Sequence, residues 1–325
     1  MRLLPQSTFQ TFRAQPESAI LFFFVLVQIV CVAATLLFPE EFRYLSEPNI
    51  QVLLKSIAPL GILALGVGVL MVAGEFDLSV GAVFTFAAIL TASLTEAGMP
   101  AFLALFAGIA VGMFAGVLNG IISIQFSIPS FIVSLGGMLV WKGATLLYHG
   151  ATSQMFRPSS AFDAIFGSQL WLLHASFIWF FILAIACYFL LHHHKLGNHF
   201  FAVGGNLGAA TAIGINPTRV KLIAFAFAGG FAAFAGVIAM TRVGSVQPGG
   251  GLGMELEAIA ACVIGGVALT GGRGSVLGVV LGTALIFTIQ DVLLLIQAPG
   301  FYFDMFVGTL IIIAAVMNNV LKAKA

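Results

Sequence analysis

The sequence predicts an all-α membrane protein with about ten transmembrane helices, arranged as an inverted repeat. Its 325 residues are 60% hydrophobic and only 8% charged, whereas an ordinary soluble domain carries about 25% charged residues. Long apolar runs without charge follow one another along the chain, and a helix needs about 20 apolar residues to cross a bilayer. Because backbone polar groups cannot stay unpaired in lipid, these continuous runs are expected to form helices.

The same composition excludes several classes of protein. Too few charged residues are present for a soluble enzyme of this size, a disordered chain or a nucleic-acid binder, and the mean hydropathy of +1.11 agrees. Thirteen basic and twelve acidic residues give a net charge of +1, so no strong overall field is expected. The cysteines Cys31, Cys187 and Cys262 lie far apart in apolar runs, without zinc or disulfide spacing. We therefore expect no metal and no cofactor.

Ten candidate spans follow from the charge-free stretches and the residues that interrupt them. The stretch 97–141 carries no charge and is too long for one span, and the polar segment SIQFSIPS at 123–130 divides it. The first span is too long for the core of a signal peptide, so we expect it to be retained. The predicted spans are 19–38, 53–73, 80–95, 101–122, 128–148, 171–191, 219–240, 256–270, 275–296 and 303–321.

The distribution of Lys and Arg over the loops predicts which side of the membrane is cytoplasmic. With ten spans both termini lie on one side, and that side holds most of the basic residues. We therefore expect a single transmembrane domain over residues 1–325 with both termini in the cytoplasm. The basic residues on that side are Arg2, Arg13, Lys195, Arg219, Lys221, Arg273, Lys322 and Lys324.

The longest predicted cytoplasmic loop, residues 192–218, contains a short helix outside the membrane. Asn206 can accept the free amide protons of a first turn, and Gly214 suits a left-handed stop after the segment LGAATAI. Pro217 then opens the next span at a first helical position. A mere connector is the alternative, but the length and the defined ends of this helix favour a docking element. The histidines at 192–194 are interpreted as flanking residues at the membrane surface rather than a metal site.

The chain also shows an internal repeat. The centres of spans two to five and those of spans seven to ten are separated by a nearly constant offset along the sequence, and five spans separate each matching pair. An odd separation inverts the second copy in the membrane. Inverted repeats are common in transporters because they produce two alternative gates around one site.

Two acidic segments occur at related places in the two halves. GEFDLSVG at 74–81 carries Glu75 and Asp77, and MELEAIA carries Glu255 and Glu257. Each residue of the first pair lies 180 positions before its counterpart in the second. The two shortest predicted spans follow these segments, and charge at membrane depth is expensive enough to mark a pathway or a pair. The alternative is a polar loop at the membrane surface. We expect the carboxylates to accept hydrogen bonds from the starts of two short helices, on opposite membrane faces, and to shape two gates.

Three motifs resemble those of a known family. GEFDLSVGA looks like the GGxDLSVG signature of permease subunits from ribose-type bacterial ATP-binding-cassette sugar importers. FAVGGNLGAATAIGI resembles the cytoplasmic loop of that family, and GLGMELEAIAACVIGGVALTGGRGSVLGVVLGT resembles its long C-terminal block. The likeness extends over roughly residues 50–320. Glu75 departs from the family pattern, which has a small residue there.

The resemblance implies a permease of the bacterial inner membrane that performs no bond chemistry itself. ATP would be hydrolysed by a separate cytosolic ATP-binding-cassette ATPase, and this chain has no Walker A motif. A periplasmic sugar-binding protein and a second permease, identical or different, would complete the importer, with lipid as solvent and no nucleic-acid partner. The cargo would be a monosaccharide, a ribose-like pentose or a hexose.

Particular residues are expected to serve this function. Asn119, Ser134 and Gln290 lie at membrane depth as candidate lining groups. Any one of them could equally form a hydrogen bond between helices, which is the preferred role for Ser134. The predicted pathway and gating residues are Glu75, Asp77, Ser79, Asn119, Glu255, Glu257 and Gln290. The predicted ATPase-coupling residues are Gly204, Gly205, Asn206, Ala209, Ala210 and Gly214, with Ala209 and Ala210 against the partner.

Other functions remain open at this point. The family resemblance also allows a sugar alcohol or a furanone-type signal as cargo. An ion-coupled secondary transporter would likewise have inverted repeats and buried carboxylates, and would work without partners. A membrane-embedded enzyme would need His, Ser or Asp side chains clustered at one depth, whereas the histidines of this chain fall in loops or near the ends of spans.

Overall fold

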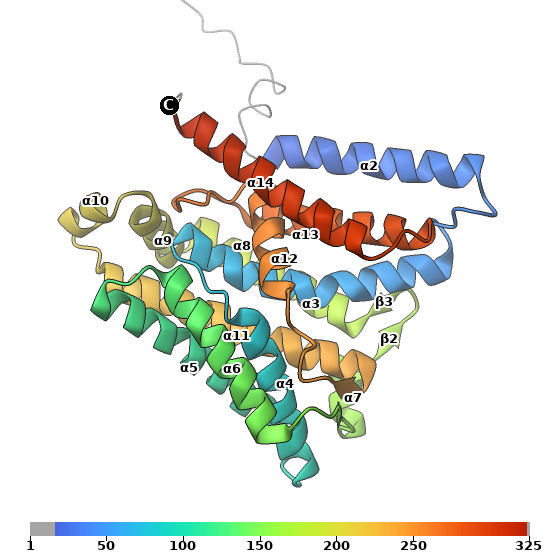
Figure 1. Ribbon diagram of the computed structural model, residues 1–325, viewed down its shortest axis with the longest axis horizontal. Helices are drawn as coiled ribbons and strands as arrows, with labels where there is room; N and C mark the ends of the chain where they lie inside the picture. Colours follow the sequence, from blue (N-terminus) through green and yellow to red (C-terminus); the bar gives the residue numbers. More distant parts are fainter. Residues whose placement is uncertain (1–16, 324–325) are drawn as a thin grey trace, which may run out of the picture.

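A computed structural model describes residues 17–323 and is built almost entirely of helices (Figure 1). Two pairs of short antiparallel strands lie between them: β1 (Gln154–Met155) pairs with β4 (Ser245–Val246), and β2 (Gln169–Leu170) with β3 (Leu173–His174). The helices are α2 (Glu17–Leu37), α3 (Glu47–Val72), α4 (Val80–Glu96), α5 (Ala101–Phe126), α6 (Ser130–His149), α7 (Ser160–Phe166), α8 (Ala175–His193), α9 (Lys195–Gly205), α10 (Leu207–Ala212), α11 (Pro217–Val243), α12 (Met254–Ile264), α13 (Val276–Leu295) and α14 (Phe301–Ala323).

The predicted all-α membrane fold is confirmed, and each of the ten predicted spans coincides with a helix. Seven helices in the described part of the chain are long and apolar enough to cross a membrane: α2, α3, α5, α6, α8, α11 and α13. The two shortest of the ten are α4 and α12, as expected, with 17 and 11 residues. At 1.5 Å per residue, α12 is only about 16 Å long and cannot cross a bilayer alone.

Packing between the helices matches the predicted inverted repeat. Helix α5 of the first half packs on α11 of the second, and α13 of the second half packs on α3 of the first. Likewise α4 contacts α11, and α12 contacts α3. Helices α3 and α11 run in opposite directions (Figure 1). Ser56 early in α3 accepts a hydrogen bond from Arg242 near the end of α11. At the other end, Glu75 just after α3 pairs with Lys221 near the start of α11.

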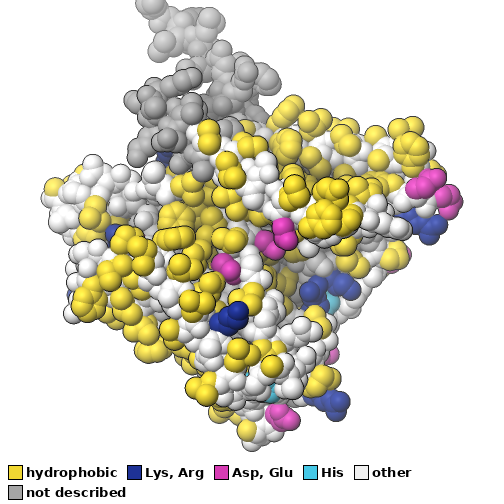
Figure 2. All heavy atoms as spheres, viewed as in Figure 1, with side chains coloured by type: hydrophobic (Ala, Val, Ile, Leu, Met, Phe, Trp, Pro, Cys, Tyr) yellow, Lys and Arg dark blue, Asp and Glu magenta, His cyan; other side chains and the backbone are white. Residues whose placement is uncertain are grey.

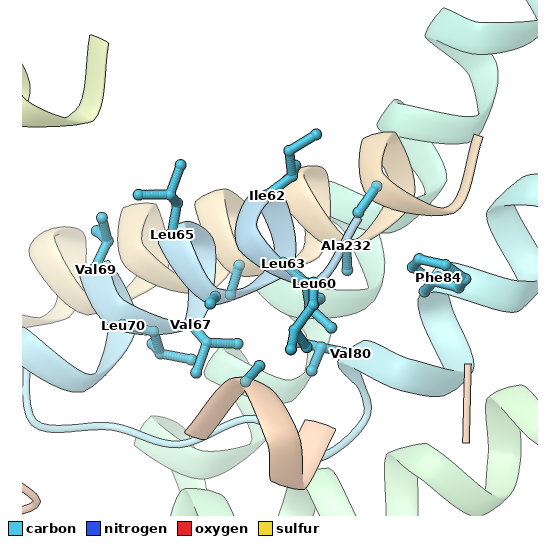
Figure 3. Packing of buried hydrophobic residues seen from close by; sticks show 14 of the residues in the cluster. Leu60, Ile62, Leu63, Leu65, Val67, Val69, Leu70, Val80, Phe84 and Ala232 are labelled. Atoms are coloured by element: carbon cyan, nitrogen blue, oxygen red, sulfur yellow. The ribbon is translucent and has the colours of Figure 1, made fainter. Parts of the chain in front are cut away.

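Helix α3 forms the centre of the core. Every residue from Ile57 to Val72 is buried, and a helix that is apolar all round belongs inside a bundle. Figure 3 shows its Leu60, Leu63 and Leu70 among side chains of neighbouring helices. The outer helices instead expose large apolar side chains, as on α2, and hydrophobic side chains cover much of the face in Figure 2. Lipid is the expected solvent for such a surface.

Helices α5 and α11 approach each other backbone to backbone. A Cβ atom at Gly229 of α11 would overlap the carbonyl oxygen of Gly112 of α5, and one at Gly112 would overlap the carbonyl oxygen of Gly229. Gly116 meets the carbonyl oxygen of Phe225 in the same way. Small residues of this kind let membrane helices pack closely where lipid offers no hydrophobic force between them.

Two short helices were not expected from the sequence. Helix α9 occupies the first part of the 192–218 loop, which we expected to hold one helix, and α7 lies in the loop after β1. Both begin at residues that cap them: His194 Nδ1 accepts from the amide of Leu196, and Ser159 Oγ accepts from the amide of Phe162. Arg2, Arg13 and Lys324, which contributed to the predicted orientation, lie outside the described residues.

Candidate functional site

The start of α4 carries a buried polar network. Asp77, which is 1% exposed, accepts hydrogen bonds from the amide and the hydroxyl of Ser79 at 2.8 and 2.6 Å. Asn119 of α5 donates its side-chain amide to Asp77 at 3.2 Å and to the Ser79 hydroxyl at 2.9 Å. Three of the predicted site residues therefore meet here, and the carboxylate accepts from the start of a short helix as expected. The network fixes the point where α4 begins.

Glu75 lies at a different place and has a basic partner. Its Oε1 atom is 2.5 Å from Nζ of Lys221 in α11, and the two side chains are only 12% and 21% exposed. The neighbouring amide of Phe76 donates to Ser130 Oγ at the start of α6. A cavity of about 510 Å³ opens beside the pair, lined also by Ser127 and Leu207. No basic residue lies near Glu75 in the sequence, so only the fold reveals this ion pair between the two halves of the chain.

The second short helix begins beside the first. Glu255 in the first turn of α12 accepts a hydrogen bond from the amide of Gly253, its N-cap residue, at 3.1 Å. The amide of Gly251 donates to Thr85 Oγ1 of α4 at 2.9 Å, and a Cβ atom at Gly81 would overlap the Glu255 carboxylate. The starts of α4 and α12 therefore touch.

This arrangement corrects the expected symmetry of the acidic residues. The loop from α3 to α4 covers 73–79, and the loop from α11 to α12 covers the longer range 244–253. The equal offset in sequence therefore does not pair equivalent positions: Glu75 lies in a loop, whereas Glu255 lies inside a helix. The two loops begin at opposite ends of the bundle, where α3 and α11 end. The helices that they lead to, α4 and α12, nevertheless start next to each other and not on opposite faces.

Glu257 and Gln290 line a second cavity, of about 480 Å³. It opens near Ser56 in the first half of α3 and Arg242 in the last turn of α11. The Glu75 cavity lies instead beyond the end of α3 and beside the first turns of α11, so the two cavities lie toward opposite ends of the bundle. Asp291, next to Gln290, also lines the second cavity.

The hydrogen bonds of Ser134 and Asn119 bear on the roles expected for them. Ser134 donates to the carbonyl oxygen of Ser130 at 2.7 Å, within its own helix, so the predicted hydrogen bond between helices is wrong. A hydroxyl four residues after a carbonyl can satisfy itself locally. Asn119 could line the path or bond a neighbouring helix, and it makes the second kind of contact: it is 4% exposed and donates to Asp77 and Ser79 at the start of α4.

Three residues of these cavities were missed by sequence reasoning. Lys221 and Arg242 count as loop or flanking cations in the sequence, although they face the interior near the two ends of α11. Asp291 is an acidic residue inside an otherwise apolar span, and that signal could have identified it. Its carboxylate accepts a hydrogen bond from Asn49 at 2.8 Å.

The loop between α8 and α11 forms the predicted helix. Asn206 Oδ1 accepts from the amide of Ala209 at 3.0 Å, which confirms its role as the cap of α10. Gly214 adopts the left-handed conformation with φ of 86°, as expected. Gly208 and Ala209 are exposed, and so are the apolar side chains of Leu207 and Ile213.

The expected orientation of one alanine is wrong. Ala210 is 2% exposed and belongs to the hydrophobic core, so it does not face outward together with Ala209. Adjacent residues on a helix point about 100° apart, and α10 therefore presents Ala209 outward while Ala210 holds the helix against the bundle.

Gly204 and Gly205 lie at a close junction of three segments. The amide of Gly272, in the loop between α12 and α13, donates to the carbonyl oxygen of Val72 at the end of α3. Gly204 packs so closely against this pair that a Cβ atom would overlap Val72, and Gly205 touches Gly272. The end of α9 is thereby held against two loops: the loop from α3 to α4 and the loop from α12 to α13.

Comparison with known proteins gives consistent matches. Residues 49–315 match the family described as branched-chain amino acid transport system, permease component. The Autoinducer 2 import system permease protein LsrC of Salmonella typhimurium is 31% identical over 300 residues, which cover 91% of this chain and 85% of the relative. The Ribose import permease protein RbsC of Escherichia coli K12 is 30% identical over 274 residues, covering 83% and 85%. No solved structure matches.

Proposed function

This chain belongs to the family of branched-chain amino acid transport system permease components, and we propose that it carries a ribose-like monosaccharide through an ATP-driven importer of the bacterial inner membrane. The chain is a membrane-embedded permease and not itself an enzyme. Relatives named for the import of ribose and of autoinducer 2 support a small polar cargo. A periplasmic binding protein, a cytosolic ATPase and a second permease would be its partners.

The observation that carries this proposal is the pair of cavities toward opposite ends of the bundle. Glu257 in the first turn of α12 lines one cavity, and Glu75 just before α4 lines the other. The starts of these two helices touch at Gly81 and Glu255. We infer that a cargo moves from one cavity to the other by way of this contact. Inverted repeats meeting at such a contact allow one side to open while the other stays closed.

The end that carries α10 is assigned to the cytoplasm. Helix α10 exposes Leu207, at 49%, and Ile213, at 74%, next to the small residues Gly208 and Ala209. Leu207 also lines the Glu75 cavity, so a protein that binds α10 contacts an element of that cavity directly. The glycine junction at Gly204 offers a second connection, toward the loops next to α4 and α12.

Uptake by the purified permease tests the proposal. Proteoliposomes with the permease, its ATPase and its binding protein should accumulate labelled D-ribose only with ATP. The same assay with autoinducer 2 decides between the two cargoes named in the relatives. Accumulation by the permease alone, in response to an ion gradient, would instead support an ion-coupled secondary transporter.

A cysteine-labelling experiment tests the orientation. The native Cys31, Cys187 and Cys262 are buried and should react slowly. Ser160 and Gly208 are both exposed, and they lie at opposite ends of the bundle. A membrane-impermeant thiol reagent should label a Ser160→Cys variant in intact cells. It should label a Gly208→Cys variant only after the cells are permeabilised. Labelling of both variants from outside would contradict ten spans with α10 in the cytoplasm.

Arginine at position 209 should uncouple the importer. Ala209 is exposed on α10, so Ala209→Arg leaves the fold intact but prevents close approach of an ATPase. We expect copurification of the ATPase to be lost and uptake to fall at least about tenfold, which corresponds to roughly 1.4 kcal/mol of lost association. Ala161→Arg, at an exposed position on α7, is the matched control and should behave as the native chain. Native coupling in the Ala209→Arg variant would show that α10 faces solvent.

A further inference from the structure

The cavity beside Arg242 has walls from both halves of the protein. Ser56 comes from α3, Arg242 from the end of α11, and Gln290 and Asp291 from α13. Its volume of about 480 Å³ lies in the range of small-molecule sites. The lining includes the aromatic side chain of Phe287 together with these polar groups.

Arg242 is partly buried, and its hydrogen bonds are not complete. One terminal nitrogen donates to Ser56 Oγ at 3.1 Å, while its buried Nε has no hydrogen-bond partner in the part of the chain that the structure describes. No described carboxylate pairs with this guanidinium, although Glu257 and Asp291 line the same cavity. A buried donor of a cation without an acceptor is costly, so a ligand with oxygen acceptors would stabilise it.

The other polar groups of the cavity complement this donor. The Glu257 carboxylate accepts no hydrogen bond from the described residues, and that of Asp291 accepts one, from Asn49. Carboxylates only accept hydrogen bonds, whereas a guanidinium only donates them. A ligand that satisfies both must present groups that donate and accept at close spacing.

Hydroxyl groups meet this requirement, and we propose that Arg242, Glu257 and Gln290 form a binding site for an uncharged polyhydroxylated compound within the permease itself. Two carboxylates and one guanidinium line the cavity, so an anion is repelled by the carboxylates, and a bare cation offers no acceptor to the guanidinium. The apolar face of a sugar ring packs on Phe287 while its hydroxyls bond the polar wall. This inference rests on the proposed function and names the site at which the cargo is recognised.

Protection from labelling tests the site in the permease–ATPase complex. Gln247 is exposed and lines the cavity, so a Gln247→Cys variant should react with an impermeant methanethiosulfonate. D-ribose at twice its dissociation constant should slow this reaction about threefold, whereas the anionic D-ribose 5-phosphate should not. Adding Arg242→Gln should abolish the protection. Adding Arg157→Gln, at an exposed arginine, should leave it unchanged.

The outcomes separate this inference from the proposed function. Import of D-ribose without protection, or with protection that survives Arg242→Gln, overturns the site and leaves the function standing. Protection that depends on Arg242 without import of D-ribose supports the site and overturns the cargo. If neither import nor protection occurs, both are wrong.

Discussion

Replacing Asp77 with leucine is expected to abolish uptake. The carboxylate is buried and accepts hydrogen bonds from the Ser79 amide, the Ser79 hydroxyl and the Asn119 side chain. Leucine leaves these donors unpaired, and each unsatisfied buried donor costs about 1–3 kcal/mol. The start of α4, which forms half of the contact between the cavities, would then lose its fixed position. Uptake of labelled D-ribose by the complete importer measures this loss.

The asparagine variant separates the acceptor oxygen of Asp77 from its negative charge. Asp77→Asn keeps an acceptor oxygen at the same place, so we expect partial uptake. Asp163→Leu, at an exposed aspartate of α7, controls for the loss of any carboxylate and should transport normally. Near-native uptake by both Asp77 variants would show that the network around Ser79 does not hold the gate.

Alanine at position 229 is expected to destabilise the whole bundle. The added Cβ atom would overlap the carbonyl oxygen of Gly112, and backbone atoms of two packed helices cannot yield as a flexible side chain can. Overpacking of a core typically costs about 1–3 kcal/mol. We expect a clear fall in the thermal midpoint and in the yield of monodisperse protein, both measured by fluorescence-detected size exclusion after heating.

Gly136 provides a matched control for this substitution. It lies in α6 with no heavy atom within 4 Å of an added Cβ. Alanine favours helix over glycine by about 0.8–1.0 kcal/mol, so Gly136→Ala should be neutral or stabilising. If Gly229→Ala melts at the same temperature as Gly136→Ala, the crossing of α5 and α11 is looser than the structure shows.

The two sets of variants act on different properties of the permease. Gly229→Ala changes how tightly the first half packs on the second, and its effect should appear in stability before transport is measured. Asp77→Asn keeps an acceptor in place of the carboxylate, so its effect should appear in transport with a nearly native thermal midpoint. A fall in stability for Asp77→Asn equal to that for Gly229→Ala would assign Asp77 a role in folding rather than in gating.

Features that depend on neighbouring residues could be predicted from the order of the amino acids alone. The ten spans follow from runs of apolar residues, and the short α4 and α12 follow from the breaks around them. The cap of α10 joins Asn206 to the nearby amide of Ala209, and Ser79 donates to Asp77 in the same turn. Interactions over this short range are set by the backbone geometry of a single helical turn, which does not depend on where the helix packs in the fold.

Packing between distant segments settles which remote groups meet and which faces point inward. Glu75 pairs with Lys221, and Ser56 with Arg242, because α3 and α11 pack in opposite directions. Ala210 is buried because α10 packs against α9 and α11. In a soluble helix the polar face would reveal the orientation, but here lipid and protein interior are equally apolar. The pattern of apolar residues therefore does not distinguish the face toward the protein interior from the face toward the membrane. Polar residues within the spans, such as Gln290 and Asp291, do mark a cavity, but packing decides which remote groups they meet there.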